Sequence, residues 1–178
     1  KGAHVLLDAF LRADMPNTNL KLFGDGSADR EYYENVKSTS RGNPRVEFCG
    51  RYRHEDLPSI LGSLDVVVIP SLWWENSPLV LLTALACGVP AVVSDLGGLT
   101  ESVQDGVNGY SFKAGDIDAL ATVIRTIASS PSRLQELRAG ITYPARIEEE
   151  AVLYEKLYQD IWRPGETPGK AGRRRRIP

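Results

Sequence analysis

The hydrophobic positions of this 178-residue chain follow a repeating pattern. Short apolar runs, many of them β-branched, alternate with longer stretches in which apolar residues recur every three or four positions. The short runs indicate strands and the longer stretches indicate helices, and their alternation is typical of βαβ units around a parallel sheet. We therefore expect an α/β protein with a Rossmann-like, doubly wound parallel sheet that carries helices on both faces.

The apolar runs predict five strands in that sheet. They lie at Leu20–Phe23, Val46–Cys49, Val66–Ile69, Ala91–Ser94 and Tyr110–Phe112. The third run is almost continuously apolar, which predicts a strand buried on both faces. Helices are predicted at Ala3–Ala13, Asp29–Ser40, Asp56–Ser63, Pro78–Cys87, Thr100–Gln104 and Ile117–Ala128, with two more after the last strand. Because the chain opens on a helix, we expect a further strand upstream.

Local signals support several of these helix ends. Asp116 is placed to cap the helix from Ile117, and Pro131 suits the first position of the next helix. Gly88 follows Cys87 as a left-handed stop.

The C-terminal part of the chain has a different character. From Pro144 onward, the apolar spacing predicts one long amphipathic helix. Packing onto this chain's own core and docking onto another domain both explain it. We expect one domain over residues 1–163 and a basic, disordered tail over 164–178, which contains Lys170 and Arg173 to Arg176. The tail is interpreted as a solvated end, with contact to an anionic membrane surface as the alternative.

The composition narrows the choice of function. A net charge of −2 does not favour nucleic-acid binding. No apolar run approaches the ~20 residues of a membrane span and no secretory leader is visible, so we expect a cytoplasmic protein, with the inner face of the membrane left open. Two cysteines, Cys49 and Cys87, are expected to be buried free thiols, and the lack of Cys and His clusters predicts no zinc site.

The richest chemistry lies in the segment from Pro70 to Pro90. It follows an apolar strand and opens a helix, so it is expected at the carboxyl edge of the sheet, where doubly wound folds bind ligands. The first turn of that helix would present the N–H groups of Leu79 and Val80, while Pro78 has none. Together with the helix dipole, these groups predict a binding position for a diphosphate.

Glu75 precedes this helix and has two interpretations. A carboxylate offers about four lone-pair sites, which suit the hydroxyl groups of a sugar. Alternatively, Glu75 is only a negative charge that favours a helix N-terminus. The second interpretation leaves the preceding pair, Trp73 and Trp74, without a role, although these rings can simply pack.

At this segment the sequence resembles the retaining glycosyltransferases of group 1, which have the GT-B fold and include many mannosyl- and glucosyltransferases of bacterial surface polysaccharides. The resemblance covers residues 1–140. It is carried by Lys1-Gly2, Gly24-Asp25-Gly26, Phe48 to Arg51, Asp65 to Ser71, Glu75 to Pro90, Gly97 to Glu101, Asp105 to Gly109 and the helix after Gly115-Asp116.

The resemblance implies that the chain is one half of a GT-B fold and binds a UDP- or GDP-linked sugar for transfer with retained configuration, without a metal or other cofactor. It implies that Lys1 reaches the phosphates and Glu75 binds the transferred sugar. An N-terminal domain, absent here, would hold the acceptor, so the isolated chain is expected to be inactive. The remaining residues expected at the donor are Gly24, Gly26, Arg51, Tyr52, Asn76, Ser77, Pro78, Leu79, Val80 and Thr83.

One position departs from the family pattern. The family pairs two glutamates separated by seven residues, whereas here Glu75 is followed by Thr83. In the family the second glutamate is expected to bind the ribose, and a threonine can offer only one hydrogen bond there. We therefore expect weaker or altered nucleotide binding at Thr83.

Three alternatives to glycosyl transfer differ in how well they fit the sequence. A non-catalytic nucleotide-binding or regulatory module would explain Thr83. Epimerases and phosphorylases share the GT-B architecture, but no lysine suits a phosphorylase's pyridoxal cofactor. A dinucleotide enzyme fits poorly, since Gly24-Asp25-Gly26 lacks the third glycine of that fingerprint.

Overall fold

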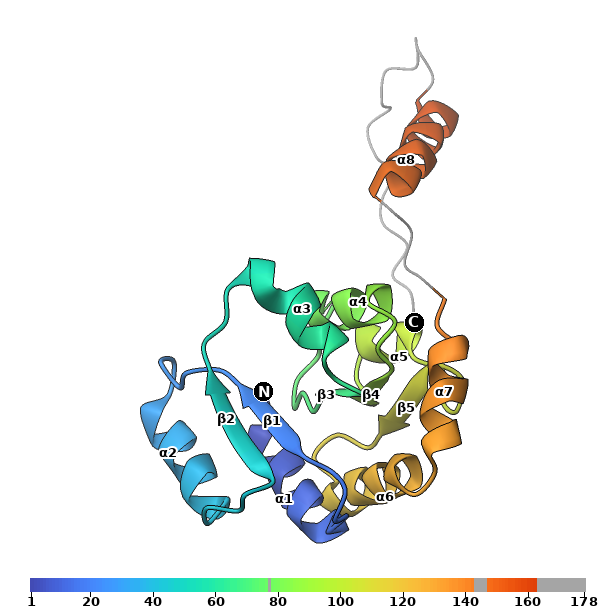
Figure 1. The fold of residues 1–178 in the computed structure, drawn as a ribbon. Coiled ribbons are helices and arrows are strands. Elements are labelled where there is room, and N and C mark those ends of the chain that lie inside the picture. Colours follow the sequence, from blue (N-terminus) through green and yellow to red (C-terminus); the bar gives the residue numbers. More distant parts are fainter. Residues whose placement is uncertain (77, 143–146, 163–178) are drawn as a thin grey trace, which may run out of the picture. The chain divides into compact units, whose positions relative to one another are not determined.

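Strands and helices alternate from Ala3 to Ala128 in the computed structural model, which describes residues 1–76, 78–142 and 147–162 (Figure 1). The chain divides into two units, Lys1–Pro144 and Ala145–Pro178. The strands of the first unit are β1 (Leu20–Phe23), β2 (Val46–Gly50), β3 (Val67–Ile69), β4 (Ala91–Ser94) and β5 (Gly109–Phe112). All five predicted strands are therefore confirmed to within one residue at each end.

The helices of the first unit also follow the prediction. They are α1 (Ala3–Ala13), α2 (Arg30–Thr39), α3 (Leu57–Gly62), α4 (Leu79–Ala86), α5 (Gly98–Ser102), α6 (Ile117–Ala128) and α7 (Pro131–Ala139), and a 3-10 turn, η1 (His54–Asp56), precedes α3. The Asp116 carboxylate accepts the Ala119 N–H at 2.9 Å, which confirms the predicted cap of α6. Gly88 has φ of 72°, the left-handed conformation predicted after α4.

The five strands form two hydrogen-bonded sheets instead of the single sheet that was expected. β1 pairs with β2, while β3, β4 and β5 form a second sheet in that order, and every pairing is parallel. β1 and β3 each have one edge with which no strand of the described residues pairs. The strand expected upstream of Lys1 stays a prediction.

Burial along the second sheet differs from the prediction in one respect. We expected β3 to be buried on both faces, but Val68 and Ile69 are only half-buried. All four residues of β4 are buried instead. The reason is position: β4 has a neighbouring strand on either side, whereas β3 pairs on one side only.

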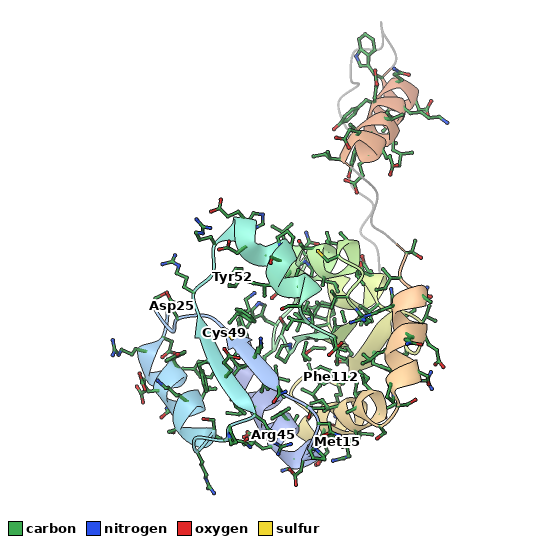
Figure 2. All side chains as sticks on the ribbon, in the orientation of Figure 1. Met15, Asp25, Arg45, Cys49, Tyr52 and Phe112 are labelled. Carbon is green, nitrogen blue, oxygen red and sulfur yellow. The ribbon has the colours of Figure 1, made fainter. Side chains whose placement is uncertain are left out.

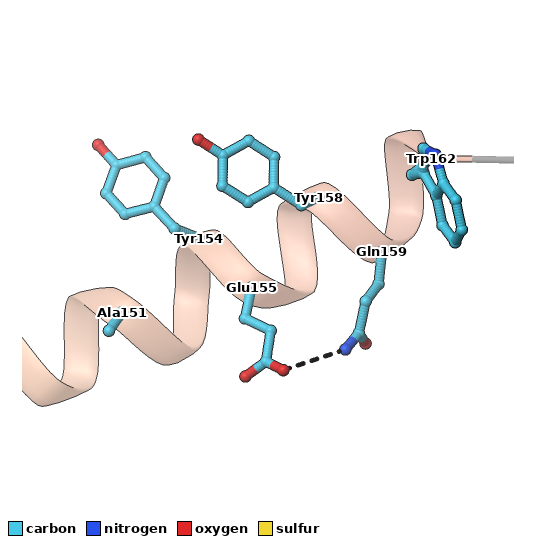
Figure 3. A pocket seen from close by; sticks show the side chains of 6 residues that line it. All are labelled: Ala151, Tyr154, Glu155, Tyr158, Gln159 and Trp162. Atoms are coloured by element: carbon cyan, nitrogen blue, oxygen red, sulfur yellow. Dashed lines mark hydrogen bonds between the residues drawn. The ribbon is translucent and has the colours of Figure 1, made fainter.

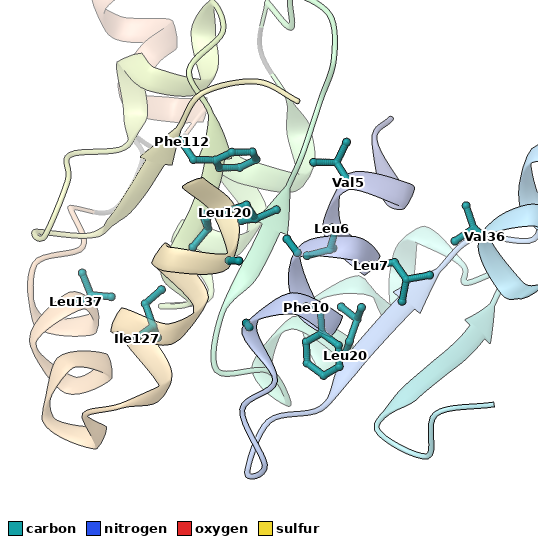
Figure 4. Packing of buried hydrophobic residues seen from close by; sticks show 14 residues of the cluster. Val5, Leu6, Leu7, Phe10, Leu20, Val36, Phe112, Leu120, Ile127 and Leu137 are labelled. Atoms are coloured by element: carbon teal, nitrogen blue, oxygen red, sulfur yellow. The ribbon is translucent and has the colours of Figure 1, made fainter. Parts of the chain in front are cut away.

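One hydrophobic cluster spans both sheets of the first unit. Leu7 of α1 and Leu120 of α6 are fully buried in it, and the same cluster contains Leu20 of β1 and Phe112 of β5 (Figure 4). A second hydrophobic cluster fixes α4, because Leu81 of this helix packs with residues of β4 and α5. The two sheets therefore pack on one continuous hydrophobic cluster.

The second unit contains α8 (Ile147–Ile161), which confirms the predicted long helix. None of its residues is buried, and Tyr154, Tyr158 and Trp162 line a shallow hollow along it (Figure 3). Packing on this chain's core and docking on another domain therefore both stay predictions. The basic tail over 164–178 lies outside the described residues.

Two further sequence expectations concern cysteines and membrane spans. Cys49 and Cys87 are free, as expected, but each is half-buried and not buried. Cys49 lies on β2, which pairs only with β1, and Cys87 lies at the end of α4. Partial burial raises the pKa of the Cys49 thiol. Within the described residues, no helix has the length and apolar character needed to cross a bilayer.

Candidate functional site

The candidate site lies where β3 ends and α4 begins. Glu75 belongs to the loop between these two elements, and its carboxylate Oε1 lies 2.6 Å from the Nζ of Lys1. The two groups differ in exposure, because the Lys1 side chain is 70% exposed and that of Glu75 only 18%. The expected phosphate-binding cation and sugar-binding carboxylate are therefore brought together.

Two further side chains complete this contact. The Ser71 hydroxyl donates to the same Glu75 oxygen at 3.0 Å, and the Lys1 ammonium lies 4.9 Å from the centre of the Trp73 ring, a cation–π distance. The Lys1 ammonium holds the pKa of the Glu75 carboxyl below its ordinary value, and the Ser71 hydroxyl adds to this effect. Glu75 is therefore a carboxylate at neutral pH and accepts hydrogen bonds.

Gly2 explains how α1 comes so close to the end of β3. Its φ is 76°, and a Cβ at this position would overlap the carbonyl oxygen of Pro70. Only glycine allows the chain to begin α1 in this conformation at this distance. Lys1 is thereby held beside the loop that carries Glu75.

The first turn of α4 has the donor groups that the sequence predicted. Pro78 is the N-cap residue, and its carbonyl accepts the Leu81 N–H at 2.9 Å. Within the part of the chain that the structure describes, the N–H groups of Leu79 and Val80 have no hydrogen-bond acceptor. These amides and the helix dipole can bind an anion. Ser77, also predicted here, lies outside the described residues.

Thr83 lies one turn further along α4. Its hydroxyl donates to the Leu79 carbonyl at 2.7 Å, so this group is already engaged within its own helix. Asn76, in contrast, is exposed in the loop beside Glu75. A ligand hydrogen bond from the Thr83 hydroxyl would have to replace the internal one.

A second group of predicted residues lies at the carboxyl ends of β1 and β2. The Gly24 N–H donates to the Gly50 carbonyl at 2.8 Å, which joins the start of the loop after β1 to the last residue of β2. The Nη1 of Arg51 lies 3.8 Å from the Oδ2 of Asp25, and the ring centres of Phe23 and Tyr52 lie 5.9 Å apart in an edge-to-face contact. Figure 2 labels Asp25 and Tyr52, one from each of the two segments that follow these strands. The donor residues predicted after β1 and those predicted after β2 are therefore adjacent to each other.

Gly26 stands at the turn into α2. Its φ is 67°, and a Cβ there would overlap the Tyr33 side chain. The turn is closed by the Asp29 N–H, which donates to the Gly26 carbonyl at 3.2 Å. Glycine is thus required at this predicted position for backbone conformation and for close packing.

His4 and Tyr32 connect the two groups of site residues. The His4 backbone N–H donates to the Tyr32 hydroxyl at 3.1 Å, and the two rings meet edge to face. This contact joins the first turn of α1, which follows Lys1 and Gly2, to the first turn of α2, which follows the turn at Gly26. Among the described residues, no hydrogen bond or ion pair runs directly from the Gly24–Gly26 loop to Glu75.

Three residues that contact Glu75 or Lys1 were not among the site residues predicted from the sequence. Ser71 bonds the carboxylate, Trp73 lies under Lys1, and Gly98 donates its N–H to the Glu75 backbone carbonyl at 2.9 Å. Ser71 and Gly98 both belong to motifs of the resemblance, which is the signal that could have found them. Trp73 was noted only as one of two rings that lacked an explanation.

Comparison with known proteins gives one family. A family model described as Glycosyl transferases group 1 matches residues 1–130. The glycogen synthase of Mycobacterium tuberculosis is 33% identical over 137 residues, which are 76% of this chain and 33% of that protein. The GDP-mannose-dependent alpha-(1-6)-phosphatidylinositol monomannoside mannosyltransferase of Mycolicibacterium smegmatis is 32% identical over 141 residues, 75% of this chain and 37% of that protein.

A solved structure gives the same result for the fold. HepE of Anabaena in complex with UDP superposes with a TM-score of 0.78 and 25% identity, covering 89% of this chain and 45% of that one. This chain therefore spans less than half the length of the relatives named here. The expected fold class, an α/β domain that forms one half of a GT-B fold, is confirmed. The chain belongs to the glycosyl transferases group 1 family.

Proposed function

We propose that this chain binds the nucleotide-diphosphate sugar of a retaining glycosyltransferase whose acceptor is held by an N-terminal domain. The observation that carries the proposal is the contact between Lys1 and Glu75 at 2.6 Å beside the first turn of α4. A cation, a hydrogen-bond-accepting carboxylate and a set of helix N-terminal amides converge there. A sugar diphosphate needs these three kinds of group.

Each group has a separate task in the proposed reaction. Negative charge grows on the diphosphate as the sugar leaves, and Lys1 with the Leu79 and Val80 amides would stabilise this charge. Glu75 would accept hydrogen bonds from the sugar hydroxyls and so orient the anomeric carbon. The lysine and the amides supply the positive charge that a metal ion would otherwise bring, so we propose a metal-independent transfer.

Catalysis would require the domain that lies outside this chain. A leaving diphosphate depends on positioning and charge stabilisation from both sides of a closed site from which water is excluded. This chain supplies the donor side, and it covers 33% of the glycogen synthase named above. We therefore expect the isolated chain to bind donors without transferring the sugar.

Calorimetric titration with UDP and with GDP, at low and at physiological salt, tests the proposal. Both nucleotides are needed because HepE is described with UDP and the mannosyltransferase as GDP-mannose-dependent. We expect saturable binding of one nucleotide in preference to the other, weakened by salt. Glu75→Ala should weaken the sugar nucleotide more than the free diphosphate. Failure of both nucleotides to bind at millimolar concentration would contradict the proposal.

A second candidate function is a non-catalytic nucleotide-binding or regulatory module. The observation that favours it is Thr83, which replaces the second glutamate of the family and bonds its hydroxyl to Leu79 at 2.7 Å. The two functions differ in one measurable property of the full-length protein. Nucleotide binding without transfer or hydrolysis of any donor sugar would favour the module, and turnover would exclude it.

A further inference from the structure

The loop that precedes α5, together with the first residue of α5, packs directly against the loop that carries Glu75. The Gly98 N–H donates to the Glu75 backbone carbonyl at 2.9 Å. The two loops belong to different connections, since one joins β3 to α4 and the other joins β4 to α5. Glu75 is therefore fixed at two places, at its carboxylate by Lys1 and Ser71 and at its backbone by Gly98.

The contact requires glycine at two successive positions. Gly97 has φ of 49° and ψ of −136°, a conformation that side chains disfavour. A Cβ on Gly97 would lie 2.8 Å from the Glu75 carbonyl oxygen and 2.9 Å from the Trp74 ring, and a Cβ on Gly98 would overlap the carbonyl of Asn76. Any larger residue would therefore push the Glu75 loop away.

Hydrogen bonds and packing on either side of Gly97 and Gly98 fix the loop that carries them. The Asp95 N–H donates to the Phe112 carbonyl at 2.8 Å, and the Asp95 carboxylate accepts the Ala114 N–H at 2.8 Å. On the other side of the pair, Leu99 is completely buried in the cluster that also contains Leu81 of α4. The loop therefore cannot move back to make room for a side chain without loss of these contacts.

We propose that Gly97 and Gly98 are positioning residues that set the place of Glu75, so that its carboxylate meets the donor sugar. They act on the sugar through Glu75 and not by contact with it. This inference rests on the proposed function, because it assigns the sugar to Glu75. It adds a specific cause for the placement of that carboxylate: a backbone contact from a neighbouring connection of the fold.

The test substitution is Gly97→Ala, which places a methyl group against the Glu75 carbonyl and the Trp74 ring. We expect affinity for the preferred sugar nucleotide to fall about tenfold, as for a lost hydrogen bond to a charged group. Affinity for the free nucleoside diphosphate should change by less than about twofold. Gly62→Ala is the matched control, since a Cβ there meets no atom within 4 Å. Equal losses for both ligands would overturn the proposal.

A double-substitution cycle separates positioning from a general structural effect. If Gly97 acts through Glu75, Gly97→Ala should cause no further loss in a Glu75→Ala background. Independent, additive losses would overturn the proposal. Asp95→Ala loosens the same loop without adding atoms near Glu75, and it should show a smaller loss with the same ligand pattern. It serves as the test variant if Gly97→Ala does not fold, as judged by its thermal unfolding.

A measurement without ligand distinguishes failure of this inference from failure of the proposed function. The Lys1 ammonium lowers the pKa of the Glu75 carboxyl, and this can be followed by NMR titration. Gly97→Ala should raise that pKa toward the ordinary value, because the carboxylate moves away from Lys1. An unchanged pKa would overturn the inference even if the wild-type chain binds donors. If Gly97→Ala raises the Glu75 pKa but the wild-type chain binds no nucleotide, only the proposed function is contradicted.

Discussion

Lys1 and Glu75 are separated by 74 positions in the chain, yet their charged groups meet at 2.6 Å beside the start of α4. The contact depends on Gly2, which lets α1 begin against the carbonyl of Pro70 at the end of β3. It also leaves Lys1 largely exposed, while Glu75 is mostly covered. An accessible cation is thus placed beside a carboxylate whose direction is set by the loop around it.

Replacement of Lys1 should weaken phosphate binding. For Lys1→Met we expect about tenfold lower affinity for the preferred nucleoside diphosphate, because a charge-assisted hydrogen bond is lost. The dependence of affinity on salt should also become shallower. Titration calorimetry at two salt concentrations measures both effects. Lys37→Met, at an exposed position on α2, is the control. If both variants bind equally well, Lys1 does not contact the phosphates.

The lowered pKa of Glu75 makes stability depend on pH in a defined direction. A carboxyl whose pKa is lower in the folded than in the unfolded state stabilises the fold above the unfolded value, 4.5, and loses this effect as pH falls through the folded value. The difference in unfolding free energy between wild type and Glu75→Gln should therefore be constant near neutral pH and shrink below 4.5. Urea unfolding across pH measures it.

The control for this pH dependence is Glu34→Gln, which removes the charge of an exposed glutamate on α2. A second comparison uses Lys1→Met, in which the main cause of the lowered Glu75 pKa is removed. The pH-dependent difference should become smaller in that background. A difference that stays the same size would mean that another group holds the Glu75 carboxylate.

Restoring the family's second glutamate should strengthen nucleotide binding. Thr83→Glu removes a hydroxyl that is engaged with the Leu79 carbonyl and adds a carboxylate at that turn of α4. We expect about tenfold higher affinity for the preferred nucleoside diphosphate, through charge-assisted hydrogen bonds to the ribose. Thr122→Glu on α6 is the control, since its hydroxyl makes the same kind of bond to Asp118. Unchanged affinity in Thr83→Glu would show that this position does not face the ribose.

The core beneath α4 should contribute strongly to the stability of the first unit. Leu81 is completely buried against residues of β4 and α5, so Leu81→Ala removes packed methyl groups and leaves a cavity. We expect a loss of about 2–5 kcal/mol in the free energy of unfolding, measured with urea. Leu72→Ala, in the exposed loop before α4, should cost less than about 0.5 kcal/mol. Similar losses for the two variants would contradict this assignment of the core.

The elements and their order were predictable, because strand and helix periodicity are local properties of the chain. The boundaries of α1, β1, β4 and α6 agree with the prediction residue for residue. α5 begins two residues earlier than predicted, at Gly98, where Gly97 adopts a conformation typical of glycine. From apolar content alone, β3 was predicted to be buried on both faces. In the structure β4 is the more deeply buried strand, because it has a neighbouring strand on either side.

The sequence by itself determined the family, the alternation of strands and helices, and the segment in which Glu75 precedes a helix N-terminus. The family follows from motifs along residues 1–140 and the alternation from local hydrophobic periodicity, while the Glu75 segment lies within one loop and one turn of helix. Only the tertiary structure decided which groups surround Glu75, because Lys1 and Gly98 reach it through other connections of the fold. Such contacts depend on how α1 and α5 pack beside α4, and no local pattern of residues encodes that packing.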